Sequence, residues 1–203
     1  MKPVIIASEL RNHAPFTTFG TVTGIVIMAV FVHFQISKDI SATLFWLTHP
    51  LHVFLSALVT TAMYRIHGEG GAVRTIIIGY LGAVGIATLS DSLIPYVGEW
   101  LLDLPHRGVH LGFIEKWWLI NPLAVVGVAV GYFLPRTKVS HAGHVLLSTW
   151  ASLFHMIMAL GTELDVATWI LAALFLFLAV WVPCCTSDIV FPLLWIKDKG
   201  DAP

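Results

Sequence analysis

Residues 41–64 read SATLFWLTHPLHVFLSALVTTAMY, a run of 24 residues that contains no Lys, Arg, Asp or Glu. A transmembrane helix needs about 20 mostly apolar residues, so this stretch is long and apolar enough to cross a bilayer. It nevertheless contains two histidines three positions apart, His49 and His52. The sequence therefore predicts a membrane helix that carries ionisable side chains inside the bilayer.

The rest of the 203-residue chain has the same character. Hydrophobic residues make up 57% of it and charged residues only 11%, and a soluble domain of this size could not bury so much apolar surface in one core. We therefore expect an all-α polytopic integral membrane protein in which residues 1–203 form a single membrane domain. The predicted transmembrane helices are 15–36, 41–64, 73–100, 117–134, 139–161 and 166–195.

The charges of the chain are few and balanced. The formal net charge is −1, from 11 basic and 12 acidic residues, so nothing favours nucleic acid as a partner. Lys and Arg are more numerous on the side of the membrane where both termini are predicted to lie, and positive charge accumulates on the cytoplasmic side. We expect cytoplasmic termini, a prokaryotic plasma membrane and surrounding lipid, with further copies of the chain or partner subunits as open alternatives.

Two short motifs each occur twice, in the same order. Residues 49–56 (HPLHVFLS) and 141–148 (HAGHVLLS) share the pattern HxxHVxLS, and residues 90–95 (SDSLIP) and 187–192 (SDIVFP) share SDxxxP. The copies lie three predicted helices apart, and because three is an odd number the second copy enters the bilayer from the opposite side. The sequence therefore predicts a 3+3 inverted-topology repeat, with units 15–100 and 117–195.

The repeated motifs predict two equivalent metal sites, one toward each face of the membrane. Side chains at i, i+3 and i+7 share one face of a helix, and an aspartate from a neighbouring helix completes each set. Two imidazoles and a carboxylate suit a borderline divalent ion such as zinc, iron, manganese, cobalt or nickel. The predicted ligands are His49, His52 and Asp91 for the outer site and His141, His144 and Asp188 for the inner site.

Three further residues break the predicted symmetry. Cys184 and Cys185 precede the second SDxxxP motif, where a thiolate could add a soft ligand to the inner site. Buried cysteines are also common as small hydrophobic residues. His155 lies in the outer half of its predicted helix, where it could join the outer site as a metal ligand or lie between the two sites.

Structural explanations of these polar residues stay open. Histidines near helix ends often lie at the membrane interface, and an aspartate can cap backbone groups released by Pro95 or Pro192. Residues 103–116 form a connection predicted on the outer side of the membrane, with Asp103, His106, His110 and Glu115. This connection is either a place where an ion is captured or an ordinary polar loop.

The patterns together favour a membrane transporter of a divalent transition metal over an enzyme, since inverted repeats and interrupted helices are typical of alternating-access carriers. A haem b electron carrier is one alternative, because His141 and His155 lie roughly 21 Å apart along a helix and could each hold a haem. A metal-dependent oxidoreductase or hydrolase is another, with Asp91 or Glu99 acting as base on a metal-bound water. An integral subunit of a larger complex is the third.

Overall fold

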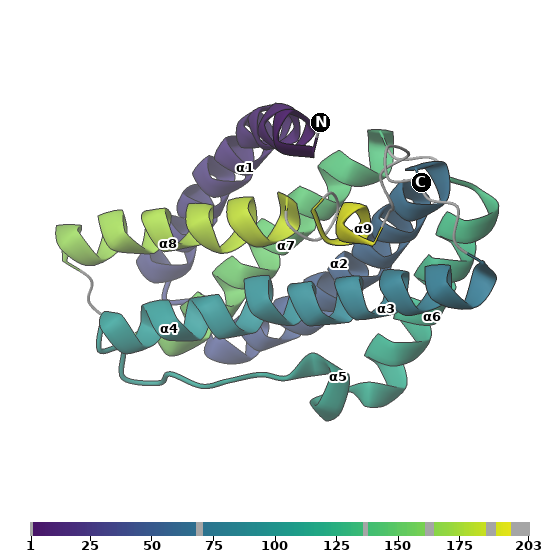
Figure 1. The fold of residues 1–203 in the computed structure, drawn as a ribbon. Helices are drawn as coiled ribbons and strands as arrows, with labels where there is room; N and C mark the ends of the chain where they lie inside the picture. Colours follow the sequence, from purple (N-terminus) through teal and green to yellow (C-terminus); the bar gives the residue numbers. More distant parts are fainter. Residues whose placement is uncertain (1, 68–70, 136–137, 161–164, 186–189, 196–203) are drawn as a thin grey trace.

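The computed structural model describes residues 2–67, 71–135, 138–160, 165–185 and 190–195, and all regular elements in these ranges are helical. The prediction of an all-α chain is confirmed. Figure 1 shows the arrangement of the helices. They are α1 (Lys2–His33), α2 (Lys38–His67), α3 (Ala72–Thr88), the π-helical turn η1 (Leu89–Leu93), α4 (Ile94–Leu101), α5 (Gly112–Glu115), α6 (Trp117–Phe133), α7 (Lys138–Ala159), α8 (Val166–Cys185) and α9 (Phe191–Leu194).

Long apolar helices give the chain the character of a multi-pass membrane protein. Five described segments are long and apolar enough to cross a bilayer: Ala14–His33, Lys38–Ile66, Ala72–Leu101, Ala142–Ala159 and Val166–Pro183. The predicted span at 117–134 is also an apolar helix, but α6 has only 17 residues. At 1.5 Å per residue it is about 26 Å long, slightly less than the roughly 30 Å of a typical hydrocarbon core.

The first and last predicted spans correspond to helices in the structure. The first, 15–36, agrees with the apolar segment Ala14–His33, while the helix α1 begins earlier, at Lys2, and continues through Pro15. The last predicted span, 166–195, is covered by α8, Val190, α9 and Trp195, apart from 186–189, which lie outside the described residues.

α2 lies at the centre of the bundle and packs against α7, α6 and α3. α7 packs in turn against α1 and α8. α3, η1 and α4 follow one another as a single long rod (Figure 1), and after α4 the chain turns back as an extended segment that leads to α5. We call residues 102–116 the outer connection.

Glycines allow α6 to approach α2 closely. A Cβ placed on Gly127 would lie 2.3 Å from the carbonyl oxygen of Phe54, and a Cβ on Gly131 would lie 2.3 Å from that of Leu58. Small residues four positions apart are a common way to bring membrane helices together. These two positions on α6 therefore have room for glycine alone.

A similar pair of glycines lies between α1 and α7. A Cβ on Gly20 would lie 2.8 Å from Oγ1 of Thr149, and a Cβ on Gly24 would lie 3.7 Å from a methyl carbon of Leu153. The first contact is too short for any larger residue unless Thr149 moves, whereas the second is an ordinary van der Waals distance. α1 therefore approaches α7 most closely at Gly20.

The interior of the bundle holds a group of polar side chains beside its apolar core, and its outer surface is apolar. Large apolar side chains are exposed along α1, α3, α6 and α8, as expected for helices that face lipid. Ionisable residues within membrane spans usually face the protein interior, and those of the central helices do so here. The buried polar residues of α2, η1, α4 and α7 include Thr48, His49, His52, Ser56, Ser90, Asp91, Ser92, Glu99, His144, Ser148, Ser152 and His155.

Candidate metal centre

Asp91 lies in the middle of the π-helical turn η1 and is fully buried. Such turns occur frequently at functional sites and leave a carbonyl oxygen out of the regular helical bonding. The hydroxyl of Ser152 on α7 donates a hydrogen bond of 2.8 Å to the carbonyl oxygen of Ser90. α7 therefore stabilises the turn that presents Asp91 to the interior.

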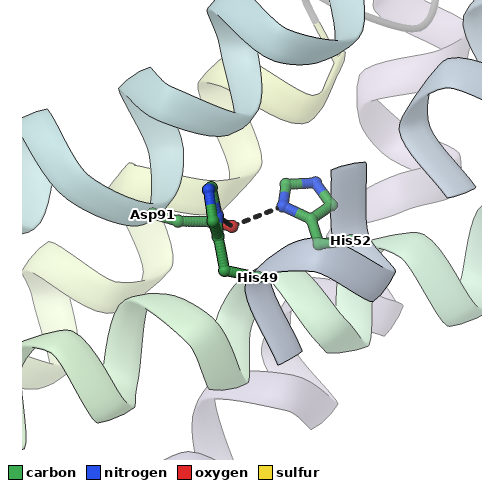
Figure 2. Close-up of side chains that lie close together, drawn as sticks. All are labelled: His49, His52 and Asp91. Atoms are coloured by element: carbon green, nitrogen blue, oxygen red, sulfur yellow. Dashed lines mark hydrogen bonds and ion pairs between the residues drawn. The ribbon is translucent and has the colours of Figure 1, made fainter. Parts of the chain in front are cut away.

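His49 and His52 both point to Asp91 (Figure 2). Nδ1 of His49 lies 2.9 Å from Oδ2 of Asp91, and Nδ1 of His52 lies 2.6 Å from the same oxygen. All three side chains are buried, and one potential ligand atom from each lies within 4.8 Å of the others. The structure thus brings together the three residues that the sequence predicted for the outer site.

The other carboxylate oxygen of Asp91 also has two partners. The hydroxyl of Ser90 donates to Oδ1 at 2.6 Å, and the hydroxyl of Ser148 on α7 donates to it at 3.0 Å. An ionised carboxylate can only accept hydrogen bonds, so both imidazoles donate to it through Nδ1 and keep a lone pair on Nε2. Nε2 of His52 is buried and has no hydrogen-bond partner within the described part of the chain.

His144, which the sequence assigns to a site near the opposite face, lies beside His52 in the structure. Its ring stacks on that of His52, with ring centroids 4.7 Å apart and an angle of 28° between the planes. The prediction placed the HxxHVxLS motif at the start of each helix. In the structure α2 begins at Lys38, eleven residues before His49, or roughly 17 Å along the axis, whereas α7 begins at Lys138, three residues before His141.

The remaining residues of the predicted inner site are not covered. Asp188 lies outside the described residues, and so do the side chains of His141, Cys184 and Cys185. A separate inner metal site with these ligands therefore stays a prediction.

His155 is paired with a different carboxylate. Its Nδ1 lies 2.7 Å from Oε1 of Glu99, and both side chains are buried. The ring of His155 packs edge-on against Phe45 and His110, at centroid distances of 5.4 and 5.3 Å. A haem bound to this ring would have to displace these neighbours. The sequence did not predict this pair. The one signal for it was an acidic residue, Glu99, within an apolar span.

The outer connection covers the metal centre from the α4 side. A Cβ on Gly112 would lie 2.5 Å from Nε2 of His49, so the backbone at this glycine lies directly against the imidazole. The backbone N–H of His110 donates to the hydroxyl of Ser92 at 3.1 Å. The ring of Phe45 stacks on His49 with centroids 5.3 Å apart.

His110 and Glu115, which the sequence left open as ion-capturing residues, pair with each other. Nδ1 of His110 lies 3.2 Å from Oε2 of Glu115, and their side chains are 34% and 40% exposed. The backbone N–H of Gly108 donates to Oε2 of Glu99 at 3.2 Å. The outer connection therefore contains the half-exposed His110 and also donates a hydrogen bond to the buried carboxylate of Glu99.

The buried triad of His49, His52 and Asp91 is a candidate site for a metal ion. Two imidazoles and one carboxylate are ligands typical of zinc and of first-row transition metals, and three protein ligands leave coordination positions open. Comparisons of the chain with protein-family models, with curated proteins and with solved structures found no match.

Proposed function

We propose that the protein binds a divalent transition-metal ion at His49, His52 and Asp91 and carries it across the membrane. The observation behind this proposal is that both imidazoles converge on one buried carboxylate oxygen, at 2.9 and 2.6 Å. Metal–ligand bonds of about 2.0–2.2 Å place neighbouring ligand atoms roughly 3–3.5 Å apart. An ion that replaces the two shared protons would therefore need only small movements of these side chains.

The depth of the site supports transport. His52 is the 15th of the 30 residues of α2, so the site lies close to the middle of a membrane-spanning helix. Carriers commonly bind their substrates near the midplane, at helices whose regular bonding is interrupted. Asp91 lies in such an interruption, the π-helical turn between α3 and α4.

We also propose that the two halves of the chain form the predicted inverted repeat, and the glycine contacts support it. A Cβ on Gly127 or Gly131 of α6 would lie 2.9 or 3.0 Å from the Cβ of Ala57 or Thr61 on α2. The two HxxHVxLS motifs are separated by 92 residues, and adding 92 to positions 57 and 61 gives positions 149 and 153 on α7. The residues at these positions are the ones that face the glycines of α1. These residues are Thr149, opposite Gly20, and Leu153, opposite Gly24.

This repeat also bears on where the second set of predicted ligands lies. Because the ring of His144 lies against that of His52, we propose that His141, His144 and Asp188 extend the first site near the midplane. Cys184 and Cys185 stay sequence-based candidates for soft ligands of this second half. Zinc, iron, manganese, cobalt and nickel remain the proposed substrates.

Metal binding by purified protein tests the first part of the proposal. Dissociation constants for Zn²⁺ and Mn²⁺ would be measured by calorimetry in detergent for the wild type, His52→Ala and Asp91→Asn. We expect both variants to weaken binding roughly 100-fold or more, since they remove direct ligands. His33→Ala is the control because His33 is exposed at the end of α1. Wild-type affinity in both ligand variants would refute the site.

Uptake into proteoliposomes tests the second part. We expect wild-type protein to carry metal into the vesicles and Asp91→Asn to carry none. Asp165→Asn is the matched control, because Asp165 is exposed and accepts a hydrogen bond from the backbone N–H of Thr168, which Asn can also accept. Tight binding without uptake would assign the site to a resident metal, and a Soret band in purified protein would favour haem b instead.

A further inference from the structure

A second buried carboxylate–imidazole pair lies between α4 and α7. Oε1 of Glu99 lies 2.7 Å from Nδ1 of His155, and both side chains are almost completely buried. Ionisable residues within a membrane span are costly and usually functional. The proposed metal centre uses neither residue, so the pair needs a role of its own.

We propose that Glu99 and His155 form a proton-binding site that couples metal transport to a proton flux in the opposite direction. This inference rests on the proposed transport of metal. Among the described residues, His49, His52 and Asp91 are the one group of three potential ligands close enough to hold a metal ion. A single imidazole hydrogen-bonded to a single carboxylate binds and releases a proton as a unit, which makes a proton the fitting ligand here.

His110 connects this pair to the outer aqueous phase. Its ring lies 5.3 Å from that of His155, and its side chain is 34% exposed. Nε2 of His155 is buried and has no hydrogen-bond partner in the described ranges. A proton that leaves the pair moves to the imidazole of His110 and then to water or to Glu115. The charge of the pair falls by one and is restored when a proton binds from the opposite aqueous phase later in the transport cycle, so that each cycle moves one proton across the membrane.

Phe45 separates this pair from the metal centre while contacting both. Its ring lies 5.3 Å from the ring of His49 and 5.4 Å from that of His155. An aromatic hydrocarbon ring has no exchangeable proton, so no proton passes between the two sites through it. Two positive charges on either side of this ring repel each other strongly in a medium of low dielectric constant. Metal at His49 therefore favours loss of the proton at His155, which gives exchange in opposite directions.

The surroundings of the pair add few other titratable groups. His110 and Glu115 approach from the outer connection, and His49 lies on α2 beyond Phe45. Lys116 lies over the ring of Trp46, with Nζ 5.7 Å from its centroid. α8 has no ionisable side chain from Val166 to Pro183, and its Phe175 packs against Gly98 of α4. On α1, His33 is exposed.

Proteoliposomes loaded with a pH-sensitive dye test the proposal. A Zn²⁺ gradient across vesicles with wild-type protein is expected to drive protons against the direction of the metal. Glu99→Gln is expected to lower this proton flux, because only the protons displaced at the metal centre remain, while Zn²⁺ still moves down its gradient. The purified variant should bind Zn²⁺ with wild-type affinity, which also shows that it is folded. Asp103→Asn, an exposed acid of the outer connection, should leave both fluxes unchanged.

His155→Gln provides a second variant, because its amide can still donate to Glu99 but cannot bind a proton at neutral pH. It should lower the proton flux in the same way and keep Zn²⁺ binding. A metal-driven proton flux that is as large in both variants as in the wild type would overturn the proposal. So would a loss of Zn²⁺ affinity in both, because Glu99 and His155 would then belong to the metal centre. Absence of Zn²⁺ flux in wild-type vesicles would instead refute the transport function itself.

Discussion

The two buried carboxylates of the α3–η1–α4 rod differ in how many donors surround them. Asp91 accepts hydrogen bonds from four side chains, two imidazoles on one oxygen and two hydroxyls on the other. Glu99 accepts from one imidazole and one backbone N–H. Convergence of two imidazoles on one oxygen creates a site for an ion with several ligands, whereas a one-to-one pair has room for a proton.

The two carboxylates also differ in access. Asp91 lies behind His49, which is covered by Gly112 and Phe45. Glu99 is bonded to the outer connection itself, through the backbone N–H of Gly108. The same connection therefore covers the candidate metal centre and links the proposed proton site to the surface.

Removing the carboxylates should give the largest effect and the clearest test of this difference. Asp91→Leu leaves two imidazoles and two hydroxyls without their acceptor, and we expect a loss of about 3–5 kcal/mol in the free energy of unfolding. Glu99→Leu strands only one imidazole and one N–H, and we expect about 2 kcal/mol. Denaturant unfolding in detergent measures both values. Equal losses would show that the number of donors does not distinguish the two sites.

The cover over the metal centre is tested by Gly112→Ala. A Cβ at this position would lie 2.5 Å from Nε2 of His49, so the imidazole or the outer connection must move. We expect Zn²⁺ affinity to fall about tenfold, as when groups that orient a ligand are lost. Gly108→Ala is the matched control in the same connection, because the nearest atom to its Cβ, Nε2 of His110, is 3.8 Å away. An unchanged affinity in Gly112→Ala would mean that the cover does not restrain His49.

The role of Phe45 in separating the two sites is tested by Phe45→Leu. The change keeps an apolar side chain but removes the stacking on His49 and the edge contact with His155. We expect a loss of stability of about 1.5 kcal/mol at most, together with protons that leak through vesicles even without metal. Proton permeability measured with the internal dye reports the leak. Vesicles that stay impermeable to protons would show that Phe45 is not what keeps the two sites apart.

The smallest effect is expected from Ser148→Ala. Oδ1 of Asp91 loses the donor from α7 but keeps Ser90, so the cost in unfolding free energy should be roughly 1 kcal/mol. Ser41→Ala is the control, because the hydroxyl of Ser41 is buried without a hydrogen-bond partner among the described residues. That control should be neutral or slightly stabilising. A larger loss in the control than in Ser148→Ala would contradict the hydrogen-bond assignment.

The helices and the triad were predictable because they depend on local patterns. Apolar runs of sufficient length identify membrane helices, and the three-residue spacing of His49 and His52 places them on one helix face. Asp91 was recognised as their partner because the repeated SDxxxP motif places an aspartate on the neighbouring predicted helix. These features follow from composition and spacing along single helices.

Other features depend on how the helices lie relative to one another. The contact of His144 with His52 depends on how α7 packs against α2, and a motif within one helix does not fix that packing. The pairing of Glu99 with His155 depends on the rotation of α4 and α7 about their axes. The contact between Gly112 and His49 depends on the path of the outer connection, which has no periodic pattern to reveal it.

The π-helical turn η1 also determines the directions in which the side chains of the α3–η1–α4 rod point. On α7, Ser148 and His155 are seven residues apart, and at about 100° per residue they lie within about 20° of the same face. Their partners Asp91 and Glu99 are eight residues apart, which in a regular α-helix would turn them about 80° from each other. A π turn accommodates one additional residue, so eight residues on the rod match seven on α7. A single inserted residue therefore brings both carboxylates into register with one neighbouring helix.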